Sequence, residues 1–568
     1  MVAAPVKHYN DWPNTQGFHV TYEEREPVEL QVQGIIPSYA AGTLFRTGLG
    51  LRVVETEKDK TFRVNHWFDY LSQVHRFQIH APTENNGPVR VTYNSRSSCD
   101  GLIREIQKTG NRQGMTFGAK YDLCESFFGK IQSIFKTSKD PTKLPADTFS
   151  LAVTLSVNYP GLSPTGAKSK QLYSKGSVQT LCNKTDNNEI QMLDPETLEP
   201  IGIATQSTLH PDLKGPSSGT HAKSDPETGD VFNYNLEFKK GTGYYRVFRS
   251  NVSTGKTSIL ALVIADPAYI HSISLTKHYV ILCVWNSRFS YGGASVLWTK
   301  NIVDSLNPYD EDIKCMWYIV DRRSKEEGGQ GLVATYESDG FYCFHTVNSF
   351  EESTSDGKVD IVSDLIAYPN LDIIKRYYID NLISDSPTAA TFSKDLSWRP
   401  RMRRFRLPAV PQKKGSKSAD NVLKATSEHT AEWKISPELP TINPRKVLKK
   451  HRYVYGLVHT GKSTLFDDLV KYDLETHTAK VWSQHGHSAS EAIFVPDPAA
   501  PEDDEDNGVL LTVVMNGFSG KSYLLVLDAK QMVEIGRANV DGAIGFGFHG
   551  THVQSKLVPG VEGGALHV

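Results

Sequence analysis

Phe341-Tyr-Cys-Phe-His345-Thr-Val-Asn-Ser-Phe-Glu351 is the stretch that decides how this chain is interpreted, because it carries a histidine within an apolar, β-prone run that then turns polar. Neutral imidazole is the commonest protein ligand for transition metals and suits iron, copper and zinc. Three further histidines lie in stretches of the same build: Gly219-Thr-His221-Ala-Lys-Ser-Asp225-Pro, Pro267-Ala-Tyr-Ile-His271-Ser-Ile-Ser-Leu-Thr and Ile544-Gly-Phe-Gly-Phe-His549-Gly550.

The four histidines are far apart in sequence, unlike the close ligand pairs of a zinc finger. They could meet only in a fold that returns repeatedly to one centre, and the inner strands of a propeller do so. The alternative is that each is an ordinary core histidine on an apolar strand. The chain has 19 histidines, so composition alone singles out none of them.

Composition describes an ordinary globular protein. Of 568 residues, 39% are hydrophobic and 22% charged, and the net charge of −2 gives no overall attraction to nucleic acid. This length does not force a division into domains, because large all-β folds often exceed the usual domain size. The six scattered cysteines favour a reducing compartment. Without a signal peptide or a long apolar run, we expect a cytoplasmic protein.

Short β-prone runs separated by turn residues dominate the chain and predict a sandwich, barrel or propeller. No propeller-type sequence repeat is visible, so periodicity does not give a blade count. The clearest predicted strands are Tyr279-Val-Ile-Leu-Cys-Val-Trp, Met316-Trp-Tyr-Ile-Val, Tyr453-Val-Tyr-Gly-Leu-Val, Val509-Leu-Leu-Thr-Val-Val-Met and Tyr523-Leu-Leu-Val-Leu.

Together with the four histidine stretches, Gly42-Thr-Leu-Phe-Arg46-Thr-Gly48 and Asn65-His-Trp-Phe-Asp69-Tyr70 resemble the carotenoid cleavage oxygenases from about Val28 onward. One departure is Tyr70, where that family usually has glycine after the aspartate. The resemblance implies an all-β, seven-bladed β-propeller with a helical or loop cap, formed as a single domain over residues 1–568 with an N-terminal extension at 1–27. It also implies Fe(2+) on the propeller axis, held by His221, His271, His345 and His549.

The same resemblance assigns three carboxylates to support the ligand histidines: Asp186, Glu438 and Glu491. Such bonds fix the tautomer and ring orientation of a metal-bound imidazole. Asp186 replaces a glutamate of the family, which leaves open whether its shorter side chain reaches a ligand directly. Without the resemblance, exposed carboxylates beside turns would be the simpler interpretation. We expect Glu351, His66 and His75 to have structural roles.

An amphipathic helix is predicted at 121–137, with its apolar side chains on a single face. Packing against the core and contact with a membrane surface both explain such a face. In the resembling family this segment is the apolar mouth of the substrate tunnel, which assigns Phe127, Phe128, Ile131 and Phe135 to that mouth. A basic segment at 399–430 is predicted to be a surface loop or insertion that suits a phospholipid surface.

Gly456-Leu-Val-His-Thr-Gly461-Lys462-Ser463 matches the spacing of a phosphate-binding loop. That motif requires a helix after it, so that backbone N–H groups face the phosphates. Here Leu469–Leu474 and Thr478–Trp482 predict strand, turn and strand. We therefore expect a hairpin and no ATP.

The function implied by the resemblance is a non-haem Fe(II) dioxygenase that cleaves a C=C bond of a carotenoid with O2 into two carbonyl products. The N-terminal portion and the basic segment look most like the fungal branch that cleaves torulene to β-apo-4′-carotenal in neurosporaxanthin biosynthesis. Partners would be a lipophilic polyene, O2 and a membrane or lipid-droplet surface, without nucleic acid, and the chain is expected to be a monomer.

Other readings of the sequence remain open. A stilbene or an apocarotenoid is the alternative substrate within the family, and Lys184 resembles the lysine of stilbene cleavers, although its neighbours do not match. A relative that isomerises its substrate and cleaves an ester would also keep the metal. A non-catalytic propeller scaffold is the alternative from another class, and it predicts no bound iron.

Overall fold

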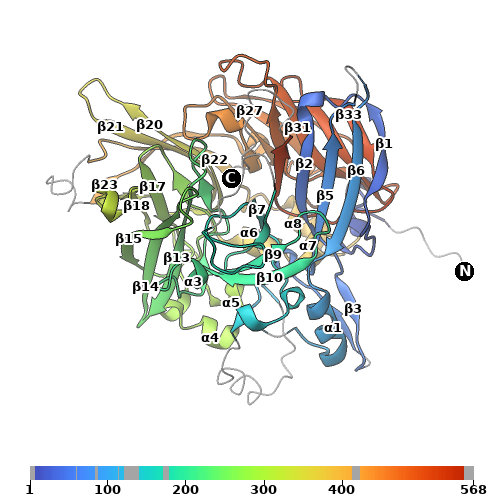
Figure 1. Cartoon of the computed structure of the whole chain (residues 1–568), viewed down its shortest axis with the longest axis horizontal. Coiled ribbons are helices and arrows are strands. Elements are labelled where there is room, and N and C mark those ends of the chain that lie inside the picture. The colour runs from blue at the N-terminus through green and yellow to red at the C-terminus, as the bar shows by residue number, and fades with distance from the viewer. Residues whose placement is uncertain are drawn as a thin grey trace, which may run out of the picture.

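The computed structural model describes residues 7–58, 60–83, 87–112, 114–119, 140–170, 178–411 and 422–555. Within these ranges the chain forms six sheets of four or more strands and a short hairpin of β3 (Val53–Glu55) and β4 (Thr61–Arg63). The sheets follow one another around a centre in chain order, so that the last strands return beside the first (Figure 1). This is a β-propeller-like arrangement.

Five of the sheets have four or five strands each. The first contains β7 (Thr154–Val157), β8 (Leu181–Lys184), β9 (Glu189–Leu193) and β10 (Pro200–Thr205). The second contains β11 (Ser217–Ser218), β12 (Lys223–Ser224), β13 (Val231–Lys239), β14 (Thr242–Ser250) and β15 (Thr257–Ala265). The third contains β16 (Ser274–Leu275), β17 (Tyr279–Val284), β18 (Cys315–Asp321), β19 (Leu332–Ser338) and the parallel strand β23 (Val422–Lys424).

The fourth and fifth sheets have four strands each. The fourth contains β20 (Tyr342–Ser353), β21 (Val359–Tyr368), β22 (Arg401–Leu407) and β24 (Thr426–Thr430). The fifth contains β25 (Glu438–Thr441), β26 (Tyr453–Val458), β27 (Asp468–Asp473) and β28 (Thr478–Trp482).

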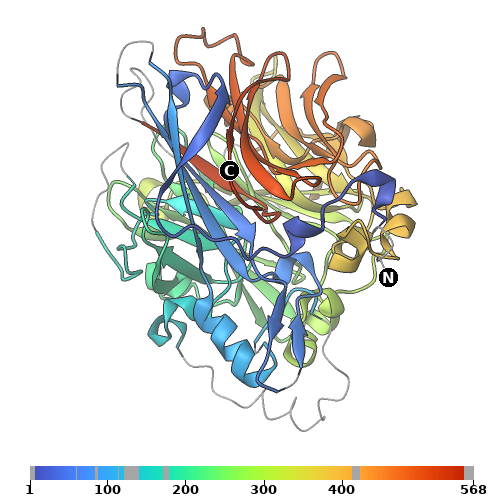
Figure 2. The same cartoon turned by 90° about the vertical axis from the view of Figure 1, so that its right-hand side faces the viewer.

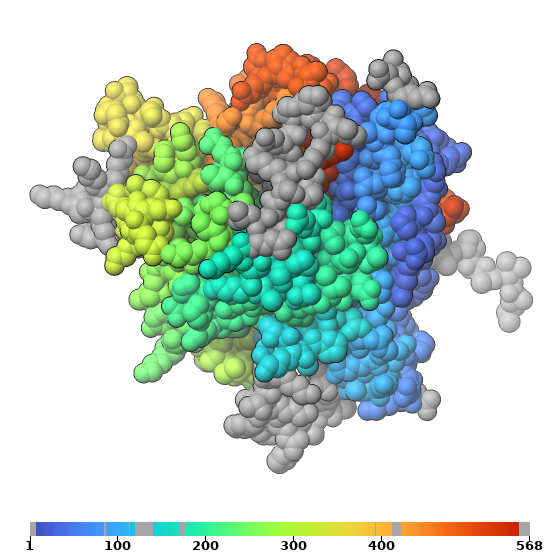
Figure 3. Space-filling model, in the orientation of Figure 1, coloured from blue at the N-terminus to red at the C-terminus, as the bar shows by residue number. Residues whose placement is uncertain are grey.

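The sixth sheet has ten strands and closes the ring. Its C-terminal members are β29 (His487–Ala489), β30 (Ile493–Pro496), β31 (Gly508–Asn516), β32 (Lys521–Asp528), β33 (Val533–Asn539) and β34 (Gly550–Gln554). Its N-terminal members are β1 (Val28–Gly34), β2 (Gly42–Leu49), β5 (Ser72–His80) and β6 (Arg90–Ser97). The two ends of the described chain therefore hold each other in place (Figures 2 and 3).

Seven separate blades are not seen among these sheets, which differs from the expectation. The reason is β1, which pairs with β33 on one side and with β6 on the other. This strand fuses the first and last parts of the ring into one continuous sheet.

The five strands singled out from the sequence correspond to β17, β18, β26, β31 and β32, so those predictions are confirmed. Their apolar runs are nearly continuous because both faces of an inner strand are covered by neighbouring sheets. All six residues of β17 are buried, as are the first eight of β31. A strand with only one covered face would alternate buried and exposed residues instead.

The basic segment 399–430 is not a loop where the structure describes it, and that prediction is wrong. β22 pairs with β21 and β24, and its apolar residues Met402, Phe405 and Leu407 are buried. Arg404 forms a two-pronged ion pair with Asp364, at 2.8 and 2.9 Å. Acidic partners on neighbouring strands therefore neutralise arginines that the sequence alone presents as an unpaired basic run. Residues 412–421 lie outside the described ranges.

The phosphate-loop match is a strand followed by a hairpin, as predicted. Gly456 lies inside β26, and β27 and β28 follow. The N–H groups of Thr460, Gly461, Lys462 and Ser463 all donate to the buried carboxylate of Asp467. The chain's own aspartate thus occupies the donors that a phosphate would need.

Short helices lie between the strands: α1 (Asp100–Thr109), α3 (Gln206–Leu209), α4 (Val296–Thr299), α5 (Ile302–Ser305), α6 (Asp372–Arg376), α7 (Ile379–Leu382) and α8 (Ala389–Lys394). α1 was not predicted; it buries Leu102 and Ile106 and ends at Gly110, whose φ of 76° suits glycine. The predicted helix 121–137, with Phe127, Phe128, Ile131 and Phe135, lies outside the described residues. No helix in the described part of the chain is both long and apolar enough to cross a membrane.

Candidate metal centre

The four histidines of the sequence pattern meet at one point. One nitrogen of each of His221, His271, His345 and His549 lies within 4.8 Å of the corresponding nitrogens of the others. The backbone N–H of His221 donates to the carbonyl of His271 at 3.2 Å, which joins two of the four stretches directly. His345 projects from β20, and His549 immediately precedes β34.

The cluster has the properties of an open set of metal ligands. All four side chains are buried. The Nε2 atoms of His345 and His549 have no hydrogen-bond partner among the described residues. Burial, and secondarily the neighbouring imidazoles, lower the pKa of His221 and His549 well below the usual range. Neutral imidazoles with inward-facing lone pairs are what a transition metal requires.

Three carboxylates bind the outer nitrogens of the cluster. The Nδ1 atom of His271 lies 2.9 Å from Asp186 Oδ1, that of His345 lies 2.6 Å from Glu438 Oε2, and that of His549 lies 2.7 Å from Glu491 Oε1. The contact of Asp186 is direct, so the shorter side chain does reach its histidine. Each bond fixes a ring with its Nε2 toward the centre.

The carboxylates differ in electrostatics. Burial raises the pKa of Glu438, but His345 and the Tyr368 hydroxyl outweigh burial and hold that pKa below its ordinary value. Burial raises the pKa of Glu491 to about 7, against the opposing effect of Arg46. Tyr269 donates to Asp186 at 2.8 Å and lowers the cost of burying that charge.

A large cavity of about 1770 Å³, here called the aromatic cavity after the side chains in its wall, meets the cluster on one side. It reaches His271, His345 and His549, and it exceeds the roughly 300–1,000 Å³ of most small-ligand pockets. Its wall is rich in aromatic side chains, several of which pack edge to face on one another: Trp67, Phe68, Phe117, Phe344, Tyr377, Phe466 and Phe548.

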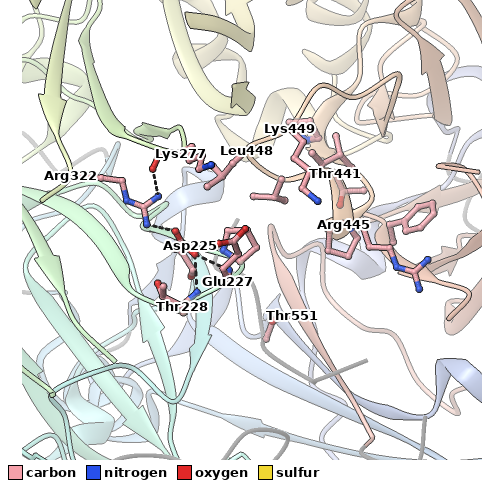
Figure 4. A pocket seen from close by; sticks show the side chains of 18 of the residues that line it. Asp225, Glu227, Thr228, Lys277, Arg322, Thr441, Arg445, Leu448, Lys449 and Thr551 are labelled. Carbon is pink, nitrogen blue, oxygen red and sulfur yellow. Dashed lines mark hydrogen bonds and ion pairs between the residues drawn. The ribbon is translucent and has the colours of Figure 1, made fainter. Parts of the chain in front are cut away.

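A second cavity of about 1280 Å³ also reaches His549 and Glu491, but its rim is charged. Figure 4 shows Arg322 directed at Asp225 on one side of this cavity, with Arg445 and Lys449 across from them. Arg322 donates to the carbonyl of Lys277 at 3.0 Å, and Lys449 forms an ion pair with Glu502. Both cavities have charged residues in their lining, but the first carries many more aromatic side chains than the second.

The other candidate histidines have structural roles. His66 accepts a hydrogen bond from the N–H of Phe68 at 3.2 Å and contacts the carbonyl of Ile374 at 2.8 Å. His75 contacts the Tyr93 hydroxyl at 2.9 Å. Glu351 binds Thr276 and His278 in the turn before β17 and lies apart from the cluster. The buried ammonium of Lys184 lies over the ring of Tyr159, 5.9 Å from its centre.

The structure adds residues that the sequence argument missed. Tyr269 lies two positions before His271, a spacing that puts side chains on the same face of an extended chain. Tyr368 donates to Glu438 from β21, and Arg46 reaches Glu491 from β2. Arg46 stands in the opening motif already noted, but nothing local indicates which carboxylate it meets.

A family model described as RPE65, retinal pigment epithelial membrane protein, matches residues 17–554. The chain belongs to this family. This family match agrees with the resemblance to carotenoid cleavage oxygenases that the sequence motifs indicated. A carotenoid dioxygenase of Neurospora crassa is 40% identical, covering 98% of this chain and 93% of that protein. A torulene dioxygenase of Fusarium fujikuroi is 39% identical, covering 96% and 95%.

Solved structures support the fold of this RPE65 family member. A mutant of the apocarotenoid oxygenase of Synechocystis superposes with a TM-score of 0.68 at 20% identity, covering 95% of this chain and 98% of that one. The cobalt-substituted Synechocystis oxygenase gives a TM-score of 0.69 at 20% identity over 96% and 98%. At this identity the likeness concerns the fold alone.

Proposed function

We propose that this chain is a non-haem Fe(II) dioxygenase that cleaves a C=C bond of a carotenoid with O2 and gives two carbonyl products. The observation that carries the proposal is the cluster of four buried imidazoles at the wall of an aromatic cavity. When bound, ferrous iron would supply the redox chemistry with O2. The names of the fungal relatives support the same activity.

The chain's own residues would position both reactants. Asp186, Glu438 and Glu491 orient three of the four ligands through Nδ1. The aromatic wall would hold a polyene by apolar contact and exclude water, because such a substrate offers no charge to recognise. No proton donor or acceptor is required of the protein.

For the substrate we propose torulene, cleaved to β-apo-4′-carotenal in neurosporaxanthin biosynthesis. Support comes from the Fusarium relative of that name and from the N-terminal resemblance. Another carotenoid, an apocarotenoid or a stilbene would be distinguished by the products of a substrate panel.

We also infer a seven-bladed propeller, counting the ten-stranded sheet as two blades. One would contain β34, β2, β5 and β6, and the other would contain β29 to β33, with β1 bridging them. The first would join the ends of the described chain through pairs such as Arg46 opposite Gly550.

A lipid surface is the proposed source of substrate. Met115 and Trp298 line the aromatic cavity yet are about half exposed, at 48% and 49%. Leu297 and Tyr291 beside them are 62% and 79% exposed. Apolar side chains at a cavity rim suit contact with the surface in which a lipophilic polyene is dissolved.

Metal content of the purified protein tests the proposal directly. Wild type, His345→Ala and the control His485→Ala, a histidine 58% exposed, would be loaded with Fe(II) without oxygen and then given torulene and O2. We expect about one iron per chain in wild type and control, loss in H345A, and a shortened aldehyde product. A folded wild-type protein that takes up no iron would contradict the proposal and favour a non-catalytic propeller scaffold.

A further inference from the structure

The opening strand β2 braces the last histidine of the cluster. Thr47 exchanges hydrogen bonds with the backbone of His549: its N–H donates to the His549 carbonyl at 3.0 Å, and its hydroxyl accepts from the His549 N–H at 3.3 Å. Arg46, one residue earlier, points to the other side of the strand and reaches Glu491. Its Nη1 donates to the Glu491 carbonyl at 2.9 Å and to Oε2 at 3.2 Å.

Arg46 is buried in a space that the glycine opposite it leaves free. It is 1% exposed, and Gly550 lies directly opposite in the β2–β34 register. A Cβ at Gly550 would stand 2.5 Å from the Cδ of Arg46, so only glycine leaves room. On the other neighbouring strand stands His75, whose pKa is lowered to about 3 by burial and by the guanidinium itself. That neighbour is neutral and does not compete with Glu491.

The donor to Glu491 differs in kind from the donors to the other two carboxylates. Tyr269 and Tyr368 are neutral phenols that donate to Asp186 and Glu438. Arg46 is a buried cation. With three carboxylates, one guanidinium and a divalent ion among neutral imidazoles, the formal charges of the loaded centre cancel. Cancellation matters because an unbalanced charge in a dry interior is strongly unfavourable.

We propose that Arg46 is a positioning residue of the metal centre: it holds Glu491 so that this carboxylate orients His549, and it supplies the positive charge that makes the loaded centre neutral. The proposal rests on the proposed function insofar as it concerns a divalent metal at this cluster. It adds a residue that contacts no histidine of the cluster within the described hydrogen bonds.

The test is the dissociation constant for Co(II), measured anaerobically by competition with a chelator, together with the visible absorption band of the bound ion. Arg46→Met keeps an unbranched apolar stem like that of arginine and removes the guanidinium with its charge. We expect R46M to weaken Co(II) binding about 10- to 100-fold and to shift the band, because His549 loses its fixed orientation. We expect R46K to bind within about threefold of wild type, since a single Nη1 makes the contact.

Two further variants separate positioning from folding. Arg376 is equally buried at 1% exposure and bonds to the carbonyls of Asn381 and Thr464 away from the cluster. R376M is expected to lower thermal stability while leaving the Co(II) constant of the folded protein unchanged. In the double variant R46M/E491Q, the loss should be no greater than in E491Q alone, because Arg46 acts through Glu491.

The outcomes are distinguishable. If wild type binds no Co(II) or Fe(II), the proposed function fails. If wild type binds metal and folded R46M binds it equally well, or if the losses of R46M and E491Q simply add, the role of Arg46 is overturned and the proposed function stands. If R46M does not fold, the other two variants decide. Weak Co(II) binding by folded R46K, or wild-type affinity in E491Q, would then overturn the role of Arg46.

Discussion

Three of the four clustered histidines are held by carboxylates, and each carboxylate has a donor of its own. The bond from His345 Nδ1 to Glu438 is 2.6 Å, and Glu438 is 2% exposed. Its other oxygen accepts from Tyr368 on β21, the strand that pairs with the strand of His345. A chain of this kind leaves little freedom for the imidazole ring, so metal affinity should depend on residues that never touch the metal.

Exchanging Glu438 for glutamine tests this dependence. Gln keeps the shape but removes the charge that favours an Nδ1–H tautomer on His345, so we expect Co(II) binding to weaken about 10- to 100-fold. Chelator competition gives the constant. Asp364→Asn is the matched control, since Asp364 is fully buried and pairs with Arg404 outside the centre. Equal affinities in E438Q and wild type would contradict the role assigned to Glu438.

At the scale of single elements, α4 and the turn before it carry exposed apolar side chains beside the aromatic cavity. Leu297 and Trp298 on α4 are exposed, and Trp298 contacts the exposed Tyr291 with ring centres 5.6 Å apart. Most apolar residues in the described part of the chain are instead buried between sheets. These exposed apolar groups beside the cavity are the basis of the proposed contact with a lipid surface.

Leu297→Asp should reduce binding to phosphatidylcholine vesicles in a flotation assay. Burying a leucine side chain in an apolar phase is worth about 1.5 to 3 kcal/mol, so we expect binding to weaken at least about tenfold. Val533→Asp is the matched control, because Val533 is 51% exposed on β33 and does not line the cavity. Equal flotation of wild type and L297D would exclude this rim as the lipid contact.

For the whole molecule, acid should destabilise the fold through fully or partly buried histidines that lie outside the four-histidine cluster. Burial lowers the pKa of His75 to about 3 and that of His451 and His552 to about 4. Below the ordinary pKa of about 6.5, the unfolded chain binds protons that the folded chain refuses, so acid favours unfolding. Glu491 opposes this trend. Its pKa is about 7 in the folded chain and 4.5 ordinarily, so between pH 7 and pH 4.5 the folded chain binds a proton that the unfolded chain does not, and this binding stabilises the fold.

Three histidines outweigh one glutamate, so stability should fall with acid. Each histidine approaches a loss of about 1.4 kcal/mol per pH unit below its ordinary pKa. We expect the free energy of unfolding, measured by urea titration of the metal-free protein at constant ionic strength, to decrease steadily from about pH 7 to about pH 5. A flat or rising profile over that range would show that these rings accept protons in the folded state.

Much of the fold was legible in the chain itself. Long apolar runs such as Val509–Met515 predicted strands. The turn after Asp473 indicated a hairpin, which ruled out a phosphate-binding loop at the matching motif. Prediction from local sequence failed where contacts with other segments change the role of a residue. The arginines of β22 look like a solvated basic loop until acidic strands pair with them, and α1 carries few apolar residues to reveal it.

By itself the sequence determined the local character of the candidate residues: four histidines in apolar, β-prone stretches and three carboxylates near turns. Their selection as one centre came from the family resemblance of those stretches. Only the tertiary structure decided that residues from 186 to 549 share one point, that Asp186 reaches His271 directly, and that Arg46 serves Glu491. The physical reason is that side-chain chemistry and strand preference are local properties, whereas the meeting of distant strands follows from closure of the ring. β1 and β34 achieve that closure by pairing the two ends of the described chain.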